Sequence, residues 1–204
     1  MFYESEKGHP FSYNPFKAIV APRPIGWISS QDNNGICNLA PYSFFNAVSD
    51  NPPMVFFSAT GIKEKKSRIK DSIKNITETK EFTVNVVSKD LLDQMNLTSG
   101  IYSHDTDEFE IANLTKGKAR IVKPPFVAES PASLECRLYK KIVLPGDTNI
   151  LILGLVVGAH INDKYLKNGI LDVSEYQPVA RLGYTHYTSV SEVFSLLRPG
   201  QKGI

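Results

Sequence analysis

The sequence Arg23-Pro24-Ile25-Gly26-Trp27-Ile28-Ser29-Ser30 is followed by Asn38-Leu39-Ala40-Pro41-Tyr42-Ser43-Phe44-Phe45-Asn46, by Asn51-Pro52-Pro53-Met54-Val55-Phe56-Phe57-Ser58 and by Lys70-Asp71-Ser72. The first three segments are apolar runs of strand length, and each ends in small polar residues. The fourth belongs to a basic turn that opens a helix. Together they predict an aromatic-lined slot with an anion site at one end, which would suit a flat, phosphorylated ligand.

Composition predicts one globular domain over residues 1–204. Hydrophobic residues make up 42% of the chain and charged residues 22%, which is enough for a sizeable core. The formal charge is +2 and the basic residues are interleaved with acidic ones, so we expect no nucleic-acid partner. The polar start shows no signal peptide, and the apolar run from Ile150 to Ile161 is too short to cross a bilayer. We therefore expect a cytoplasmic protein with no membrane partner.

Several chemistries lose support from the sequence. Cys37 and Cys136 are far apart, with no C-x-x-C pair and no histidine cluster, so we expect reduced thiols and no metal site. The nucleophile elbow, the P-loop and the G-x-G-x-x-G fingerprint are all absent. Hydrolase, nucleotide triphosphatase and Rossmann dehydrogenase functions are therefore disfavoured, and no side chain is predicted to be catalytic.

The secondary structure predicted from the sequence is mainly β. Strands are expected over residues 26–29, 36–45, 54–59, 82–87, 133–144, 149–161 and 182–187. Asn34-Gly35 predicts a tight primed turn in the first hairpin, because it supplies positive φ angles. Short helices are expected over 72–79 and 89–96, with helical turns near 107–111 and 191–196 and a loop excursion over 98–125. Strands and helices do not alternate as a doubly wound sheet requires, so an antiparallel barrel with helices at its ends fits best.

The basic turn before the helix expected over 72–79 is the first candidate site. Lys63, Lys65, Lys66, Arg68 and Lys70 surround Ser67, Asp71 and Ser72. A helix N-terminus presents unpaired amides and a positive dipole end, which suits a phosphate, and Asp71 is a plausible N-cap. The alternative is a solvated basic loop.

Two further candidates lie on the predicted strands. The segment from Asn38 to Asn46 mixes small polar residues with aromatics, which suits a bound heteroaromatic ring, and Pro41 removes a ladder amide there. The alternative is an irregular edge strand. Trp27 could lie beside a cofactor ring, although core packing is the commoner use of a single tryptophan. The residues from Arg181 to Tyr187 could line a cleft.

These motifs, in this order, resemble the flavin reductase-like, FMN-binding split-barrel proteins. That group includes flavoredoxins and the reductase components of two-component flavin monooxygenases. The resemblance covers roughly residues 15 to 190, and Ala180-Arg181-Leu182-Gly183 followed by Tyr187 resembles the family's end. It implies a six-stranded antiparallel split barrel with short capping helices, a bound FMN and a homodimer.

The resemblance also implies a set of cofactor-binding residues. Those near the isoalloxazine ring and ribityl chain are Trp27, Ile28, Ser29, Ser30, Asn38, Leu39, Ala40, Pro41, Tyr42, Ser43 and Phe44. Those near the phosphate are Ser58, Lys66, Lys70, Asp71 and Ser72. The third position of the last motif is often Thr in relatives, and Ser72 keeps the hydroxyl.

The function that the resemblance implies is an NAD(P)H:flavin oxidoreductase. NADH or NADPH would pass a hydride to FMN, which would deliver electrons to an unknown acceptor or a partner oxygenase. The first alternative is a flavoredoxin-like electron carrier that holds FMN without nicotinamide activity of its own. The second is a small-molecule binder that uses the same barrel without a flavin.

Overall fold

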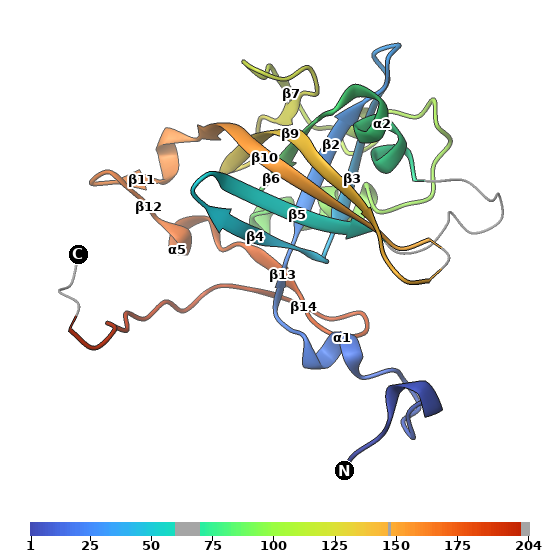
Figure 1. The fold of residues 1–204 in the computed structure, drawn as a ribbon. Helices are drawn as coiled ribbons and strands as arrows, with labels where there is room; N and C mark the ends of the chain where they lie inside the picture. Colours follow the sequence, from blue (N-terminus) through green and yellow to red (C-terminus); the bar gives the residue numbers. More distant parts are fainter. Residues whose placement is uncertain (60–69, 147, 201–204) are drawn as a thin grey trace.

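The principal sheet is a curled antiparallel half-barrel of seven strands, one more than the six-stranded barrel that the resemblance implies (Figure 1). The computed structural model describes residues 1–59, 70–146 and 148–200. The strand order is β3-β2-β6-β9-β10-β5-β4. The strands are β2 (Gly26–Gln31), β3 (Cys37–Tyr42), β4 (Phe45–Asp50), β5 (Pro53–Ala59), β6 (Glu81–Asn85), β9 (Ala132–Val143) and β10 (Ile150–Ile161).

The extra strand arises where the sequence predicted one long run over residues 36–45. The run ends at Tyr42, and β4 begins at Phe45 and pairs with β5 in a hairpin. The β2–β3 connection also differs from the predicted primed turn, since Gly35 has a φ of 92° and Asn34 does not have a positive φ. The Asp32 carboxylate accepts from the amides of Asn34 and Ile36 at 2.9 and 2.8 Å, and so closes a longer loop.

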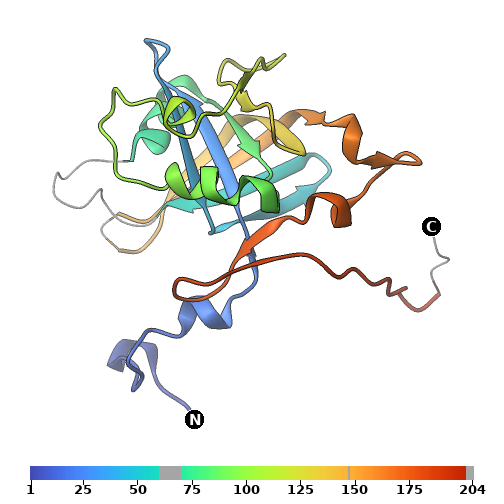
Figure 2. The same ribbon diagram turned by 180° about the vertical axis from the view of Figure 1, so that it is seen from behind.

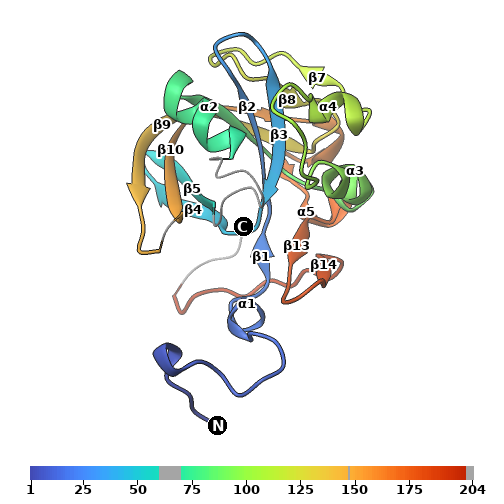
Figure 3. The ribbon, with the colours of Figure 1, turned by 90° about the vertical axis from the view of Figure 1, so that its right-hand side faces the viewer.

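The buried strand β2 separates two hydrophobic cores, because its side chains alternate between the faces of the sheet. Ile28 belongs to the core inside the half-barrel, with Phe57 and Phe82. Trp27 belongs to the core on the other face, with Leu39 and Phe109. Figure 3 shows α2 (Asp71–Thr79) on one side of the β2–β3 hairpin, and α3 (Leu92–Leu97) and α4 (Glu108–Ile111) on the other.

Smaller elements surround the half-barrel. A three-stranded sheet of β1 (Arg23–Pro24), β13 (Val179–Arg181) and β14 (Tyr187–Ser189) lies at one end. Two ribbons are formed by β7 (Lys116–Gly117) with β8 (Phe126–Val127) and by β11 (Leu166–Lys167) with β12 (Ile170–Leu171). The remaining helices are η1 (Ser5–Lys7), α1 (Phe16–Ile19), η2 (Lys89–Leu91), η3 (Asp163–Tyr165) and α5 (Val173–Tyr176).

Several predicted boundaries were wrong. The segment predicted as a strand over 182–187 is mostly the connection between β13 and β14, and residues 191–196 form no helical turn. The helical turn predicted near 107–111 is confirmed as α4, with Asp107 as its N-cap. Helix α2 starts one residue early: Lys70 is its N-cap residue, and Asp71 is its first helical residue instead of the cap.

Both terminal segments carry exposed apolar side chains. Figure 2 shows the chain before β1 and after β14 reaching away from the barrel. Phe16 and Ile19 before β1 are 54% and 70% exposed, and Phe194 and Leu196 after β14 are 84% and 87% exposed. Within the ranges that the structure describes, no helix is long and apolar enough to cross a membrane.

Glu135 is a fully buried carboxylate on β9 with four hydrogen-bond donors. The amides of Arg120, Ile121 and Val122 donate to it at 2.7, 2.6 and 2.8 Å, and His160 Nε2 lies 2.6 Å away. Burial opposes the charge, but the amides and the imidazole outweigh it and lower the pKa of Glu135 from 4.5 to about 2. The charged carboxylate therefore ties the 120–122 segment to the sheet.

We expect the Glu135→Gln variant to lower the free energy of unfolding at pH 7 by on the order of 2 kcal/mol, because hydrogen bonds to a charged group are lost. The pKa of Glu135 is lower in the folded state, so its contribution is present above about pH 4.5 and is lost as the pH falls toward 2. The difference between variant and wild type should shrink over that range in urea unfolding experiments. Glu192→Gln, in the exposed tail, is the control, and equal stabilities of both variants would contradict the assignment.

Candidate functional site

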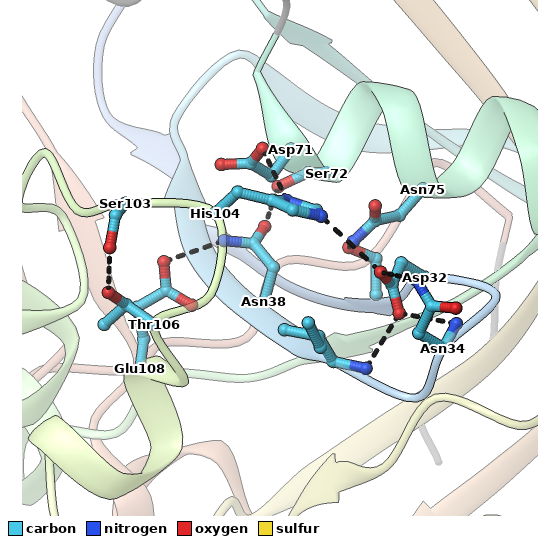
Figure 4. A network of polar contacts seen from close by, with 12 residues as sticks. Asp32, Asn34, Asn38, Asp71, Ser72, Asn75, Ser103, His104, Thr106 and Glu108 are labelled. Atoms are coloured by element: carbon cyan, nitrogen blue, oxygen red, sulfur yellow. Dashed lines mark hydrogen bonds and ion pairs between the residues drawn. The ribbon is translucent and has the colours of Figure 1, made fainter.

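The N-terminus of α2 meets β3 at a network of polar side chains (Figure 4). Ser72 Oγ donates to Asn38 Oδ1 at 2.5 Å. Asn38 Nδ2 donates to Glu108 Oε1 at 2.8 Å, and the Leu39 amide donates to Glu108 Oε2 at 2.9 Å. Since its amide nitrogen faces Glu108, Asn38 presents its oxygen to Ser72. One buried carboxylate on α4 therefore orients the side chains at the start of α2.

A second link joins the 98–125 segment to the same place. His104 Nδ1 lies 3.0 Å from Asp71 Oδ1, and His104 Nε2 lies 3.5 Å from Asp32 Oδ2. Both carboxylates are buried, at 6% and 8% exposure. Hydrogen bonds from the amides of Asn34 and Ile36 outweigh the burial of Asp32 and lower the pKa of that carboxyl group. The histidine thus bridges two negative groups beside the N-terminus of α2.

Tyr42 lies under this network, at the end of β3. Burial, followed by the negative charges of Asp71 and Glu108, raises the pKa of Tyr42 to about 12, against the opposing effect of the Ser72 hydroxyl. The Tyr42 phenol therefore stays protonated at neutral pH. The Lys70 ammonium lies 5.3 Å from the centre of its ring, so an aromatic face and a cation meet at the helix start.

Behind the network, two buried polar atoms have no hydrogen-bond partner. Asn75 Nδ2 donates to Ser30 Oγ at 3.3 Å, but Asn75 Oδ1 is unpaired, as is Ser29 Oγ. Ser29, Ser30 and Asn75 are each at most 1% exposed. Unpaired buried polar groups are costly and uncommon in native structures.

The other predicted site residues divide into enclosed and accessible groups. Trp27, Ile28 and Leu39 have no exposed surface, and the Trp27 indole donates to Thr98 Oγ1 at 2.9 Å. Ala40 packs against the inner core. The Ser58 hydroxyl donates to the Ile150 carbonyl at 3.2 Å. Lys66, with the rest of the basic turn over 60–69, lies outside the described residues.

Pro41 and Ser43 line a pocket of about 180 Å³ between the end of β3 and the β13–β14 hairpin. Arg181 and Tyr187 line it too, so the predicted cleft of the 181–187 cluster exists, although His186 is not among its lining residues. Near the pocket, the Arg23 guanidinium lies 5.8 Å and the Lys17 ammonium 6.0 Å from the centre of the Phe44 ring. The predicted residues are therefore spread over two places, with Asn38, Tyr42 and Ser72 at one and Pro41, Ser43 and Phe44 at the other.

Sequence reasoning did not place His104 and Glu108 at the site, because the 98–125 segment was predicted as a loop excursion with one helical turn near 107–111. Its one local signal was Asp107, whose side chain accepts from the Phe109 amide at 3.0 Å and starts α4. Nothing local indicates that Glu108 reaches β3, 69 residues earlier. Within 1–59, 70–146 and 148–200, no cluster of three or more histidine, cysteine or carboxylate side chains could hold a metal ion.

Comparison with known proteins identifies the class. The profile of the family described as flavin reductase like domain matches residues 20–180. A protein of Aquifex aeolicus is 36% identical over 176 residues, which cover 86% of this chain and 88% of that protein. The chain therefore belongs to the family of flavin reductase like domains, and this membership supports a flavin-related oxidoreductase function.

Solved structures share the whole fold. Nitrilotriacetate monooxygenase component B from Bacillus cereus is 27% identical, with a TM-score of 0.86 over 96% of this chain and 98% of that one. The Pseudomonas fluorescens 2-nitrobenzoate 2-nitroreductase NbaA is 25% identical, with a TM-score of 0.85 over 100% and 99% of the two chains. The predicted split-barrel class is thus confirmed, and the seventh strand of the sheet is an addition to the expected six.

Proposed function

We propose that this protein is an FMN-dependent oxidoreductase that takes electrons from NADH or NADPH. The observation that carries the proposal is the meeting of β3 with the N-terminus of α2 through the Ser72–Asn38 hydrogen bond, in a chain of this family. A helix of nine residues offers first-turn amides and a positive dipole end to a phosphate. Lys70 adds a cation and Ser72 a hydroxyl at the same point.

Groups of both signs surround the proposed phosphate site. Asp71 and Glu108 bring negative charge close to the helix start, and His104 offsets part of it when protonated. Ser72 donates its hydrogen to Asn38 in the structure, so a phosphate contact would require the hydroxyl to turn. Asn38, held by Glu108, would then keep its oxygen toward the site. The flavin ring and ribityl chain would lie along β3, toward Pro41, Ser43 and Phe44.

The chemistry divides simply between cofactor and protein. A bound flavin supplies hydride acceptance and electron delivery. The chain supplies orientation, an aromatic and aliphatic surface that excludes water, and charge at the phosphate. The electron acceptor, whether a small molecule or a partner oxygenase, would bind at the exposed face of the flavin.

The first test is the visible absorbance of the purified protein with added flavin. We expect saturable binding of FMN, tighter than binding of FAD, and bleaching of the flavin bands on addition of NADH or NADPH under anaerobic conditions. FMN binding without reduction by either nucleotide would contradict the oxidoreductase proposal and favour the electron carrier. A chain that binds no flavin would contradict both.

Two variants test the phosphate end. Lys70→Gln and Ser72→Ala should each weaken FMN binding about tenfold, because a charge-assisted contact worth about 1.4 kcal/mol is lost. Riboflavin, which lacks the phosphate, should bind both variants as it binds the wild type. Lys74→Gln, on an exposed position of the same helix, is the matched control. Equal losses for FMN and riboflavin would place the phosphate elsewhere.

We further propose a homodimer in which the terminal segments cover a second copy. Phe16, Ile19, Phe194 and Leu196 are more than half exposed in the single chain, and a second copy that covered them would remove this apolar surface from water. Sedimentation equilibrium at micromolar concentration should give twice the chain mass of 22.7 kDa. The double variant Phe194→Asp, Leu196→Asp should shift toward the mass of a single chain. A wild-type protein that sediments as a monomer would contradict the proposal.

A further inference from the structure

The pocket beside Pro41 and Ser43 has one wall built around a fixed guanidinium. Arg181 lies over the Tyr187 ring, 4.3 Å from its centre. Its Nη1 donates to the Tyr187 hydroxyl, and its Nη2 donates to the Tyr184 carbonyl at 2.7 Å. A guanidinium has five N–H donors, and within the described part of the chain these bonds use only two of its nitrogens. Arg181 is therefore both positioned and able to bind a further acceptor.

A second arginine lies directly opposite on the neighbouring strand. Arg23 and Arg181 are paired residues in the β1–β13 ladder. Burial, and then the charge of Arg181, lower the pKa of Arg23. Like charges opposite one another in a sheet are destabilising. Among the residues that the structure describes, no Asp or Glu forms an ion pair with either arginine.

Arg23 cannot turn to relieve this charge. It is 6% exposed and donates to the carbonyls of Lys17, Val20 and Leu182, the last at 2.8 Å. Its Nε is buried without a partner. The arginine pair thus holds two positive charges against neutral acceptors only, and an anion that reached Arg181 would offset their repulsion.

The other residues that line the pocket carry no charge. Ser43, Asn96 and Ser99 are polar, while Ile25, Pro41 and Met95 give the pocket an apolar surface. The Ser99 hydroxyl donates to the main-chain carbonyl of Asn96 at 2.6 Å. The Ser43 hydroxyl and the side-chain amide of Asn96 have no protein partner among the described residues. The volume of about 180 Å³ is that of a single-ring ligand, since a cavity of about 150 Å³ holds benzene.

We propose that this pocket binds a small planar carboxylate, with the carboxylate on Arg181, the ring between Pro41 and Met95, and polar substituents toward Ser43 and Asn96. The planar guanidinium matches a carboxylate with two parallel hydrogen bonds, which a neutral amide cannot form. The role of such a ligand rests on the proposed function, because Pro41 and Ser43 belong to the surface expected to face the flavin. An aromatic acid held there would lie beside the cofactor.

The experiment compares nicotinate with nicotinamide, two rings of one shape that differ in charge. Binding to the full-length protein is followed by ligand-detected NMR at pH 7, without reference to flavin absorbance. We expect nicotinate to bind at least tenfold more tightly than nicotinamide. Equal affinities, or tighter binding of nicotinamide, would overturn the proposal and favour recognition of a neutral ring.

Variants locate the site. Arg181→Gln should abolish the preference for nicotinate, and Arg137→Gln, an exposed arginine on β9, should leave it unchanged. Because Arg181 also holds the β13–β14 hairpin, Arg181→Lys and Asn96→Ala provide folded alternatives, checked by circular dichroism. Arg181→Lys should keep part of the preference, and Asn96→Ala should weaken both probes. A preference for nicotinate that survives in Arg181→Gln would place the anion elsewhere and overturn the assignment.

Failure of this proposal can be separated from failure of the proposed function. Nicotinate binding is measured with and without FMN, while FMN binding itself is scored by the flavin spectrum. A chain that binds FMN and shows no preference for nicotinate contradicts the pocket assignment alone. A chain that binds nicotinate at Arg181 but no flavin keeps the pocket and contradicts the flavin function.

Discussion

The burial of β2 on both faces is the constraint on which the rest of the structure depends. Trp27 and Ile28 are adjacent and both fully buried, so this strand needs a hydrophobic cover on each side. Helix α2 covers the inner side with Ile73 and Ile76, and Phe109 of α4 covers the outer side. Both covering helices therefore meet the β2–β3 hairpin, and their polar ends come together around Asn38. The proposed binding site follows from how the core is closed.

The polar network depends on that closure in turn. Glu108 is 4% exposed, and its bonds to Asn38 and the Leu39 amide offset the cost of burying its carboxyl group. Those bonds fix the orientation of the Asn38 side chain. Its oxygen therefore faces Ser72 and accepts the hydrogen of the Ser72 hydroxyl. Three carboxylates near the start of α2 would by themselves repel a phosphate, and Lys70 supplies an opposing charge. The site is thus balanced between attraction and repulsion, which suits a ligand that must be held without being trapped.

Much of the barrel could be predicted from local sequence signals, because the period-two pattern and the turn residues act over short distances. The strands β2, β5, β6, β9 and β10 all follow such signals. The strand β4 was missed because its exposed, polar residues, such as Asn46 and Asp50, resemble a loop, and only pairing with β5 makes it a strand. Glu108 and His104 were missed because their contacts with β3 and α2 are long-range, and a polar loop carries no sign of where it will dock.

The pairing of the two arginines could not be predicted from local sequence signals either. Arg23 and Arg181 are 158 residues apart, as their positions in the sequence show, and only the antiparallel register of β1 and β13 places one against the other. Each has a structural use, since Arg23 binds the carbonyls at the end of α1 and Arg181 binds Tyr184 and Tyr187. The hydrogen bonds do not require a positive charge, because neutral donors could bind the same acceptors, whereas the contacts with the Phe44 and Tyr187 rings do use it. Two positive charges kept at the wall of this pocket would favour an anion there, and this is the physical basis of the proposed carboxylate site.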